Sequence, residues 1–524
     1  MSLTEKYNKG LFADWVPKIV QLLLILVFII LLFPMSSIYV GNLSYMVGET
    51  GQMAEYFMWA NFAGTVGMGA AMPVAFRVKL AFKIKDKVIF ILLLVALFNF
   101  IIATTENPIV IVLVSILMNF FKMMALIEFM LPVMMILNPD GNRGKFYAMF
   151  YPFILGISQV GGYLLTKEAS YQGWEYIYFQ SGLICVVLTV VALIFMHNKH
   201  FDKPVPLYYI DWLSGILFIL CFTALAYVLS FGKQQDWFNS SKIIFAGIFT
   251  ITTFVILYYR QKILKYPFLS FNIFKRNNVK HGMVMLLMLG MFMALSSVQS
   301  IYTTGILNYD PIHNGKLNMM MLPGFVIAGI FAYNWFKAKK PIKYYIFSGF
   351  SSMMLYCLLM YFYMVPELNY ERWYLPMFFK GFGMCSLFIS AWFYTLDNLQ
   401  IGEMLAAIGI VMVWRTFVTI GIFSAIFSWL QYQFQIESLG NLAIYYDGVT
   451  LPQQLVTSNI KSIQLNAVLA ANKRLIGYVL IAGLGVLLYI VTHHFGKDRY
   501  FLIRLNELAD SAKREYRAEK KSIT

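Results

Sequence analysis

The sequence contains few charged residues. Asp, Glu, Lys and Arg make up only 13% of its 524 residues, whereas they make up about a quarter of an ordinary soluble domain. Hydrophobic residues account for 60%. This balance excludes a soluble globular fold of this length, so we expect lipid to surround most of the chain.

Cysteines are scarce and the common catalytic motifs are absent. The four cysteines lie inside hydrophobic runs without CxxC or CxxH spacing, so we interpret them as small packing residues. No HExxH, GxSxG or GxxxxGKS/T motif occurs, and we therefore expect no metal ion and no cofactor. A membrane-embedded transferase with scattered catalytic groups is a minor alternative, which a cluster of reactive His or Asp residues at one membrane face would favour.

Carboxylates are fewer than cations. The chain has 41 basic and 25 acidic residues, for a net charge of +16. The basic residues lie in short turns between apolar runs, as the positive-inside rule describes, rather than along one polar face. They indicate contact with a lipid bilayer and argue against binding to a nucleic acid.

Apolar runs recur along the whole chain, and each is long enough to cross a bilayer as a helix. We predict an all-α membrane protein with about fourteen such spans. Their approximate limits are residues 17–41, 53–76, 88–104, 108–137, 145–166, 174–196, 209–231, 240–259, 281–304, 317–336, 344–364, 373–397, 404–433 and 474–494.

Basic loops on both sides of the seventh and eighth spans divide the chain into two halves. Lys and Arg also gather in alternate loops, which predicts that both termini are cytoplasmic. The N-terminus lacks a cleavage site, so the first span is expected to be retained. The predicted units are a six-helix bundle over 1–200, a central helix pair over 201–278, a second six-helix bundle over 279–496 and a charged cytoplasmic tail over 497–524. The second bundle includes a long external loop at 435–473, which is either partly helical or a plain connection.

Several short motifs lie in the same order as in one transporter family. At the centre these are Ile210-Asp211-Trp212 with Gly215, and Asp236-Trp237-Phe238 with Ser240. Further matches are Pro267, Leu269, Ser270, Ile273, Phe274, Lys275, Arg276, Asn277, Trp59, Pro73, Gly161, Gly162, Pro323, Gly324, Gly381, Phe382, Glu403, Leu405, Ala406, Arg415 and Thr416. Together they resemble the EmrB/QacA-type fourteen-helix drug:proton antiporters of the major facilitator superfamily.

The resemblance implies two helical bundles with a central helix pair in a bacterial inner membrane. It implies proton-coupled export of hydrophobic or amphipathic compounds, with a periplasmic adaptor and an outer-membrane channel as partners. The sequence departs from the family at the first span, where no carboxylate occurs near Met35. That departure favours the alternative of a proton-independent facilitator or a carrier of lipid-like molecules, and a non-transporting receptor is a further alternative.

Ionisable residues inside the spans are the sharpest candidates for function, because a charge at a helix centre costs roughly 2.5 to 3.5 kcal/mol on insertion scales. Glu128 is the candidate proton carrier, and the alternative is a structural ion pair that never titrates. Arg415 is the candidate partner in coupling or in locking helices together. Lys122 lies about 240° around the helix from Glu128, so the carboxylate needs a partner on another helix. We expect Lys122 to bind anionic or hydrogen-bond-accepting substrates or to be structural, and Lys380 to reach the membrane surface or to contact substrate.

Polar and aromatic residues near these charges are candidates for lining a pocket for a large amphipathic ligand. Asp397 and Glu403 border a cytoplasmic turn, where we expect capping or gating roles. The predicted substrate-binding residues are Trp59, Asn119, Lys122, Gln159, Gln299, Lys380 and Trp414.

Overall fold

The computed structural model describes residues 8, 10–137, 143–202, 207, 210–265, 267–269, 271–397, 399, 401–443, 453–493 and 495. In this part of the chain almost every residue is helical, and an isolated β-bridge joins Phe12 to Met196. The predicted tail over 497–524 lies outside the described residues.

The first half of the chain consists of helices joined by short connections. They are α2 (Lys18–Leu32), η1 (Val40–Asn42), α3 (Leu43–Thr50), α4 (Ala54–Ala81), α5 (Ile84–Thr104), α6 (Pro108–Leu137), α7 (Arg143–Gln172) and α8 (Trp174–Phe195). The central pair is α9 (Trp212–Phe231) and α10 (Ser241–Ile263), with η3 (Trp237–Asn239) between them.

The second half follows the short helix η4 (Phe271–Lys275). Its elements are α11 (Asn277–Met293), α12 (Leu295–Gly305), α13 (Pro311–Met319), α14 (Leu322–Lys337), α15 (Ile342–Tyr363), η5 (Tyr370–Trp373), α16 (Tyr374–Thr395), α17 (Ile401–Thr416), η6 (Phe417–Ile422), α18 (Phe423–Ala443) and α19 (Gln453–Thr492).

These helices have the length and the outward-facing surface of a membrane protein. Within the described residues, eleven helical segments are long and apolar enough to cross a bilayer. Large hydrophobic side chains point outward, as on α10, where Phe245 is 70% and Ile251 is 67% exposed. Water is a poor solvent for such a surface, so the chain is an integral, multi-pass membrane protein.

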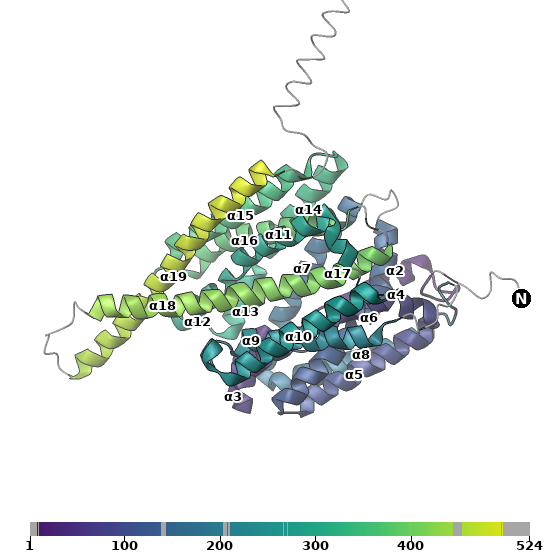
Figure 1. Ribbon diagram of the computed structural model, residues 1–524, viewed down its shortest axis with the longest axis horizontal. Coiled ribbons are helices and arrows are strands. Elements are labelled where there is room, and N and C mark those ends of the chain that lie inside the picture. The colour runs from purple at the N-terminus through teal and green to yellow at the C-terminus, as the bar shows by residue number, and fades with distance from the viewer. Residues whose placement is uncertain are drawn as a thin grey trace, which may run out of the picture.

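The two halves meet along a seam (Figure 1). Helix α4 of the first half packs against α17 of the second, and α7 packs against α13 and α14. Helices α6 and α16 lie beside this seam, because α6 packs on α4 while α16 packs on α14 and also contacts α7. The central pair joins the first half through contacts between α9 and α4.

Glycines allow the halves to approach closely at the seam. A Cβ atom on Gly409 of α17 would lie 2.7 Å from the carbonyl oxygen of Gly69 on α4, and one on Gly69 would lie 2.2 Å from a methyl group of Val413. Contacts this short exclude a side chain at either glycine without movement of the helices. The seam is therefore tightly packed at the crossing of α4 and α17.

One end of the seam is closed by contacts between α7, α14 and α16. The Arg143 guanidinium donates a hydrogen bond to the Leu396 carbonyl oxygen at 3.0 Å. A Cβ atom on Gly144 would lie 3.1 Å from Cβ of Phe336, whose ring packs 4.7 Å from the ring of Phe393. We call the contacts of Arg143, Gly144, Phe336, Phe393 and Leu396 the closed end.

The first helix of each half is interrupted. Helix α2 ends at Leu32, two residues before Pro34, and the chain stays irregular from Phe33 to Tyr39. Proline favours such a stop because it lacks an N–H donor and restricts the residue before it. In the second half, Ala294 separates α11 from α12 within the single apolar segment Asn277–Gly305.

Of the two alternatives for the segment over 435–473, the described residues fit the partly helical one. Helix α18 continues to Ala443 and α19 begins at Gln453, so helix occupies both ends of that range, while residues 444–452 lie outside the described part. The sequence is polar there because both helices project past the rest of the bundle (Figure 1). Polarity identified exposure correctly, but it did not distinguish an exposed helix from a loop.

Candidate functional site

Glu128 on α6 lies in a buried ion-pair cluster. Its two carboxylate oxygens lie 3.2 Å from Lys79 Nζ on α4 and 2.5 Å from Lys87 Nζ on α5. The Lys79 ammonium also stacks 4.5 Å from the ring of Phe201. All three charged side chains are almost completely buried, so the ion pairs tie α4, α5 and α6 together.

This cluster confirms that the partners of Glu128 come from other helices. The partners themselves were not predicted, because Lys79 and Lys87 fall between the predicted spans 53–76 and 88–104. They lie instead in the last turn of α4 and the first turn of α5, where they are buried. The structure shows the Glu128 carboxylate bound by two ammonium groups. Its role as a proton carrier stays a prediction.

Lys122 and Asn119, one turn apart on α6, hold the irregular stretch of the first helix. The Lys122 ammonium donates a hydrogen bond to the carbonyl oxygen of Met35, and Asn119 Nδ2 donates one to the Ser37 hydroxyl at 2.7 Å. The Cys185 thiol on α8 contacts the Met35 sulfur at 3.6 Å. Because backbone polar groups inside a membrane need partners, these side chains stabilise an interruption that lipid alone would not tolerate.

Lys380 on α16 makes an equivalent contact in the second half. Its ammonium donates a hydrogen bond at 2.8 Å to Gln299 Oε1 on α12, and the Tyr356 hydroxyl donates to the same oxygen at 3.0 Å. The Lys380 side chain is only 4% exposed. The expectation that it reaches the membrane surface is therefore wrong, because its acceptor lies inside the bundle.

Arg415 lies at the end of α17, next to the seam. Its guanidinium carbon is 5.2 Å from the centre of the Phe388 ring on α16, and that ring stacks on Tyr151 of α7 with ring centres 6.4 Å apart. Directly after this residue the helix widens into the π-helix η6. Such widened turns occur frequently at functional sites, and here the widening follows a half-buried cation.

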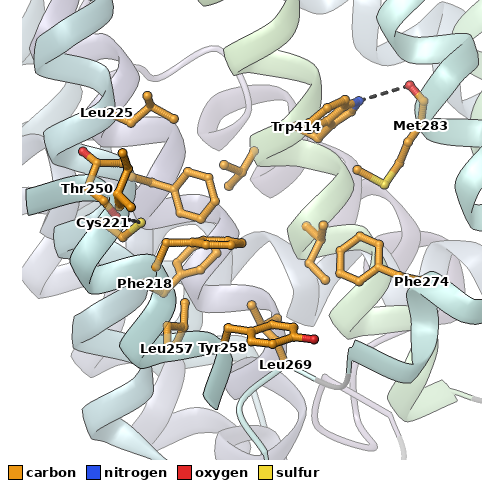
Figure 2. Close-up of a pocket in the computed structure, with 15 residues that line it drawn as sticks. Phe218, Cys221, Leu225, Thr250, Leu257, Tyr258, Leu269, Phe274, Met283 and Trp414 are labelled. Atoms are coloured by element: carbon orange, nitrogen blue, oxygen red, sulfur yellow. Dashed lines mark hydrogen bonds between the residues drawn. The ribbon is translucent and has the colours of Figure 1, made fainter. Parts of the chain in front are cut away.

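An apolar cavity of ≈ 590 Å³ lies between the central pair and the second half. Figure 2 shows Trp414 and Phe274 lining one side of it and Phe218 and Leu225 the other. The Trp414 indole donates its N–H to the carbonyl oxygen of Met283 at 3.1 Å, which satisfies its polar atom and leaves the ring facing the cavity. Of the predicted substrate-binding residues, Trp414 is the one that lines this cavity.

The remaining candidates occupy separate places. The Trp59 indole donates to the Thr223 carbonyl oxygen at 2.9 Å and so attaches α9 to the first half. Gln159 is half-buried on α7, and Asp397 follows α16. Glu403 lies in the first turn of α17, where one of its carboxylate oxygens is buried with no hydrogen-bond partner among the described residues. Their predicted substrate and gating roles stay predictions.

No family model matches the sequence, and no curated protein matches it. Solved structures do match. The peptide transporter POT in complex with sulfate aligns with a TM-score of 0.57 and 13% identity, over 93% of this chain and 97% of that one. The nucleoside transporter NupG aligns with a TM-score of 0.52 and 13% identity, over 90% of this chain and 99% of that one.

This chain has the major facilitator superfamily fold. The alignments cover nearly the whole of both chains, which confirms the predicted fold class. At these identities the likeness concerns the fold alone, and the closer resemblance to the EmrB/QacA antiporters stays a prediction.

The sequence indicated only part of this site. Lys122, Glu128, Lys380 and Arg415 were found because ionisable residues inside apolar runs are rare. Tyr356 was missed because a tyrosine among 34 tyrosines carries no such signal. Pro34 does mark the interruption of the first helix, but only the structure shows which side chains hold it.

Proposed function

We propose that this protein is a secondary transporter that exports hydrophobic or amphipathic compounds by alternating access. The observation that carries the proposal is the interruption of the first helix in both halves, at Phe33–Tyr39 and at Ala294. Discontinuous helices in corresponding positions of two halves are the best pointer to a transporter's binding site. In this chain a buried lysine binds next to each interruption.

The membrane topology belongs to the same proposal. Eleven helical segments of the described chain meet the length and hydropathy expected of a membrane span. We propose that three further segments also cross the bilayer, namely α2, α4 and the continuous α17–α18 segment, which gives fourteen spans. The basic residues of 77–87 and 337–343 then lie on the cytoplasmic side with both termini. This orientation places the closed end at the cytoplasm, so the conformation described here is one closed to the cytoplasm.

The apolar cavity suits the hydrophobic part of such a compound. It opens between helices that face lipid, and its lining is almost entirely apolar. A compound dissolved in the membrane would reach it without crossing water, which favours amphipathic substrates over small polar ones. The cavity also lies beside α17, the helix that carries Arg415.

The projecting ends of α18 and α19 are the proposed contact for a periplasmic adaptor and an outer-membrane channel. Helix α18 exposes Trp429, Tyr432 and Ile436, which are spaced three and four residues apart and therefore lie on one face. Exposed aromatic side chains on one helix face are typical of protein interfaces.

Transport in vesicles tests the proposal. Purified protein in proteoliposomes should transport a fluorescent amphipathic compound faster than protein-free liposomes, which serve as the control. An imposed pH gradient should accelerate this transport. Collapse of the gradient with a protonophore should then slow it. Absence of protein-dependent movement for every compound tested would contradict the proposal.

A proton-independent carrier is a second candidate function. It is favoured by the position of Glu128, which is bound by Lys79 and Lys87 in the described structure. Movement that is protein-dependent and unaffected by the protonophore would support this candidate over antiport.

A further inference from the structure

Lys122 and Lys380 occupy equivalent places in the two halves. Lys122 belongs to α6, the fourth long helix of the first half, and Lys380 to α16, the fourth helical segment of the second. Each lysine donates a hydrogen bond to the interrupted first helix of its own half, at Met35 and at Gln299. Helix α16 contacts α7 across the seam, and α6 packs on α4, which itself contacts α17 across the seam, so the two lysines belong to helices of opposite halves close to the seam.

Neither lysine is neutralised by a carboxylate of the described chain. Lys122 and Lys380 are 3% and 4% exposed, and their only described hydrogen bonds go to one carbonyl or amide oxygen each. An ammonium group has three N–H donors, so each lysine retains donor capacity. The contrast with Glu128 is direct, because that carboxylate is shared by two other lysines and is unavailable.

Each lysine also has a polar or aromatic group close to its ammonium. Asn119, one turn before Lys122, is 1% exposed, and its Oδ1 has no hydrogen-bond partner among the described residues. The Tyr356 ring lies 5.3 Å from the Lys380 ammonium. A buried cation without an anion is costly, and such groups in membranes usually mark a pathway for a charged substrate.

We infer that Lys122 and Lys380 form a two-part cationic site that binds the acidic group of the transported compound. The inference rests on the proposed transport function and narrows it to amphipathic organic anions such as carboxylates and sulfonates. One lysine in each half gives the anion a contact with both sides of the seam. Binding at both contacts would couple the anion to the movement of one half against the other.

Binding of matched probes tests this inference without any mutation. The probes are 1-pyrenebutyrate, 1-pyrenebutanol and 1-pyrenebutylamine, which share a ring system and chain length and differ in charge. Binding to the full chain in nanodiscs of zwitterionic lipid is followed by energy transfer from tryptophan, with empty nanodiscs as the blank. Pyrenebutyrate should bind about tenfold more tightly than the alcohol, because hydrogen bonds to charged groups are worth about 1.5 kcal/mol or more.

Single-residue variants then test whether Lys122 and Lys380 cause the preference for the anionic probe. Lys122→Gln and Lys380→Gln should each weaken pyrenebutyrate binding by about tenfold and leave pyrenebutanol binding unchanged. The exposed Lys242→Gln on α10 is the matched control and should change neither.

The outcomes separate this inference from the transport function. Equal binding of pyrenebutyrate and pyrenebutanol by the native protein would overturn the inference, as would unchanged pyrenebutyrate binding in both Gln variants. Transport of neutral or cationic probes would then still support the proposed function. Conversely, lysine-dependent binding of the anion without transport of any probe in vesicles would retain the site and reject the transporter.

Discussion

Charged side chains inside this membrane protein are arranged in two different ways. Glu128 is surrounded by cations, whereas Lys122 and Lys380 have only neutral acceptors in the described chain. The first arrangement is that of a structural connection between helices, and the second is that of a site that lacks its anion.

Glu128→Gln should destabilise the protein, because it leaves the Lys79 and Lys87 ammonium groups buried without a carboxylate. Removing one partner of a buried ion pair costs about 3 kcal/mol or more. The midpoint of thermal unfolding in detergent measures this change. The matched control is Lys79→Met/Lys87→Met/Glu128→Met, which removes every charge and should recover most of the loss. A Gln variant of native stability that transports without proton coupling would instead identify Glu128 as the proton carrier.

Asp211 should give the protein a pH-dependent stability. It caps α9 and accepts hydrogen bonds from the Ser214 amide at 3.2 Å and from Arg260 of α10 at 2.9 Å. Burial alone would raise the pKa of this carboxyl, but the hydrogen bonds from Ser214 and Arg260 outweigh it, so the pKa lies below its ordinary value. The stabilisation is therefore complete above the unfolded pKa and is lost as the pH falls through the folded pKa.

The measurement compares the native protein with Asp211→Asn. The difference between their unfolding midpoints should be constant near neutral pH and should shrink from about pH 5 to about pH 3. Glu106→Gln removes an exposed carboxylate and serves as the control, with a small difference at every pH. A difference for Asp211→Asn that stays constant over this range would show that the charge on Asp211 contributes nothing.

The close packing of α4 and α17 at the seam depends on glycine rather than on charged side chains. Gly409→Leu should force α17 away from α4, because the new Cβ atom would lie 2.7 Å from the Gly69 carbonyl oxygen. Overpacking of this kind costs about 1 to 3 kcal/mol, and we expect transport in vesicles to fall by about tenfold or more. Gly247→Leu on α10 is the matched control, since nothing lies within 4 Å of its Cβ position. Equal transport by both variants would contradict the proposed seam.

Some elements were readable from the sequence and others were not. Apolar length and flanking charge predicted most spans. The predicted span 17–41 wrongly ran through Pro34, where α2 ends because proline stops a helix locally. Ala294 carries no such signal, since alanine is the best helix former and the interruption depends on its neighbours. At the ends of α18 and α19 the sequence left a helix and a plain connection both open, because a polar stretch carries no apolar period by which a helix is recognised.

The sequence identified the individual charged residues of the site, but it did not predict which of them contact one another. Rare charges inside apolar runs identify Lys122, Glu128, Lys380 and Arg415, because burial makes them costly. Which charges pair depends on contacts across helices that are distant in sequence, as between Lys87 and Glu128. Sequence spacing excluded Lys122 as the partner of Glu128, but it contained no information about Lys79 and Lys87.

At the scale of the whole molecule, the account requires two halves that move against each other. The helical bundles are joined through the central pair and meet along a seam whose closed end includes Gly144 and Phe336. Alternating access predicts that this end opens during each transport cycle. A covalent link across it should therefore stop transport without unfolding the protein.

The most direct test is a disulfide across the closed end. Gly144→Cys/Phe336→Cys would place two Cβ atoms 3.1 Å apart, near the spacing of about 3.5 to 4.5 Å that a disulfide adopts, in a background without the four buried natural cysteines. Oxidation should abolish transport in vesicles and a reductant should restore it, while each single-cysteine variant stays active throughout. Transport at the native rate by the fully cross-linked protein would contradict the account.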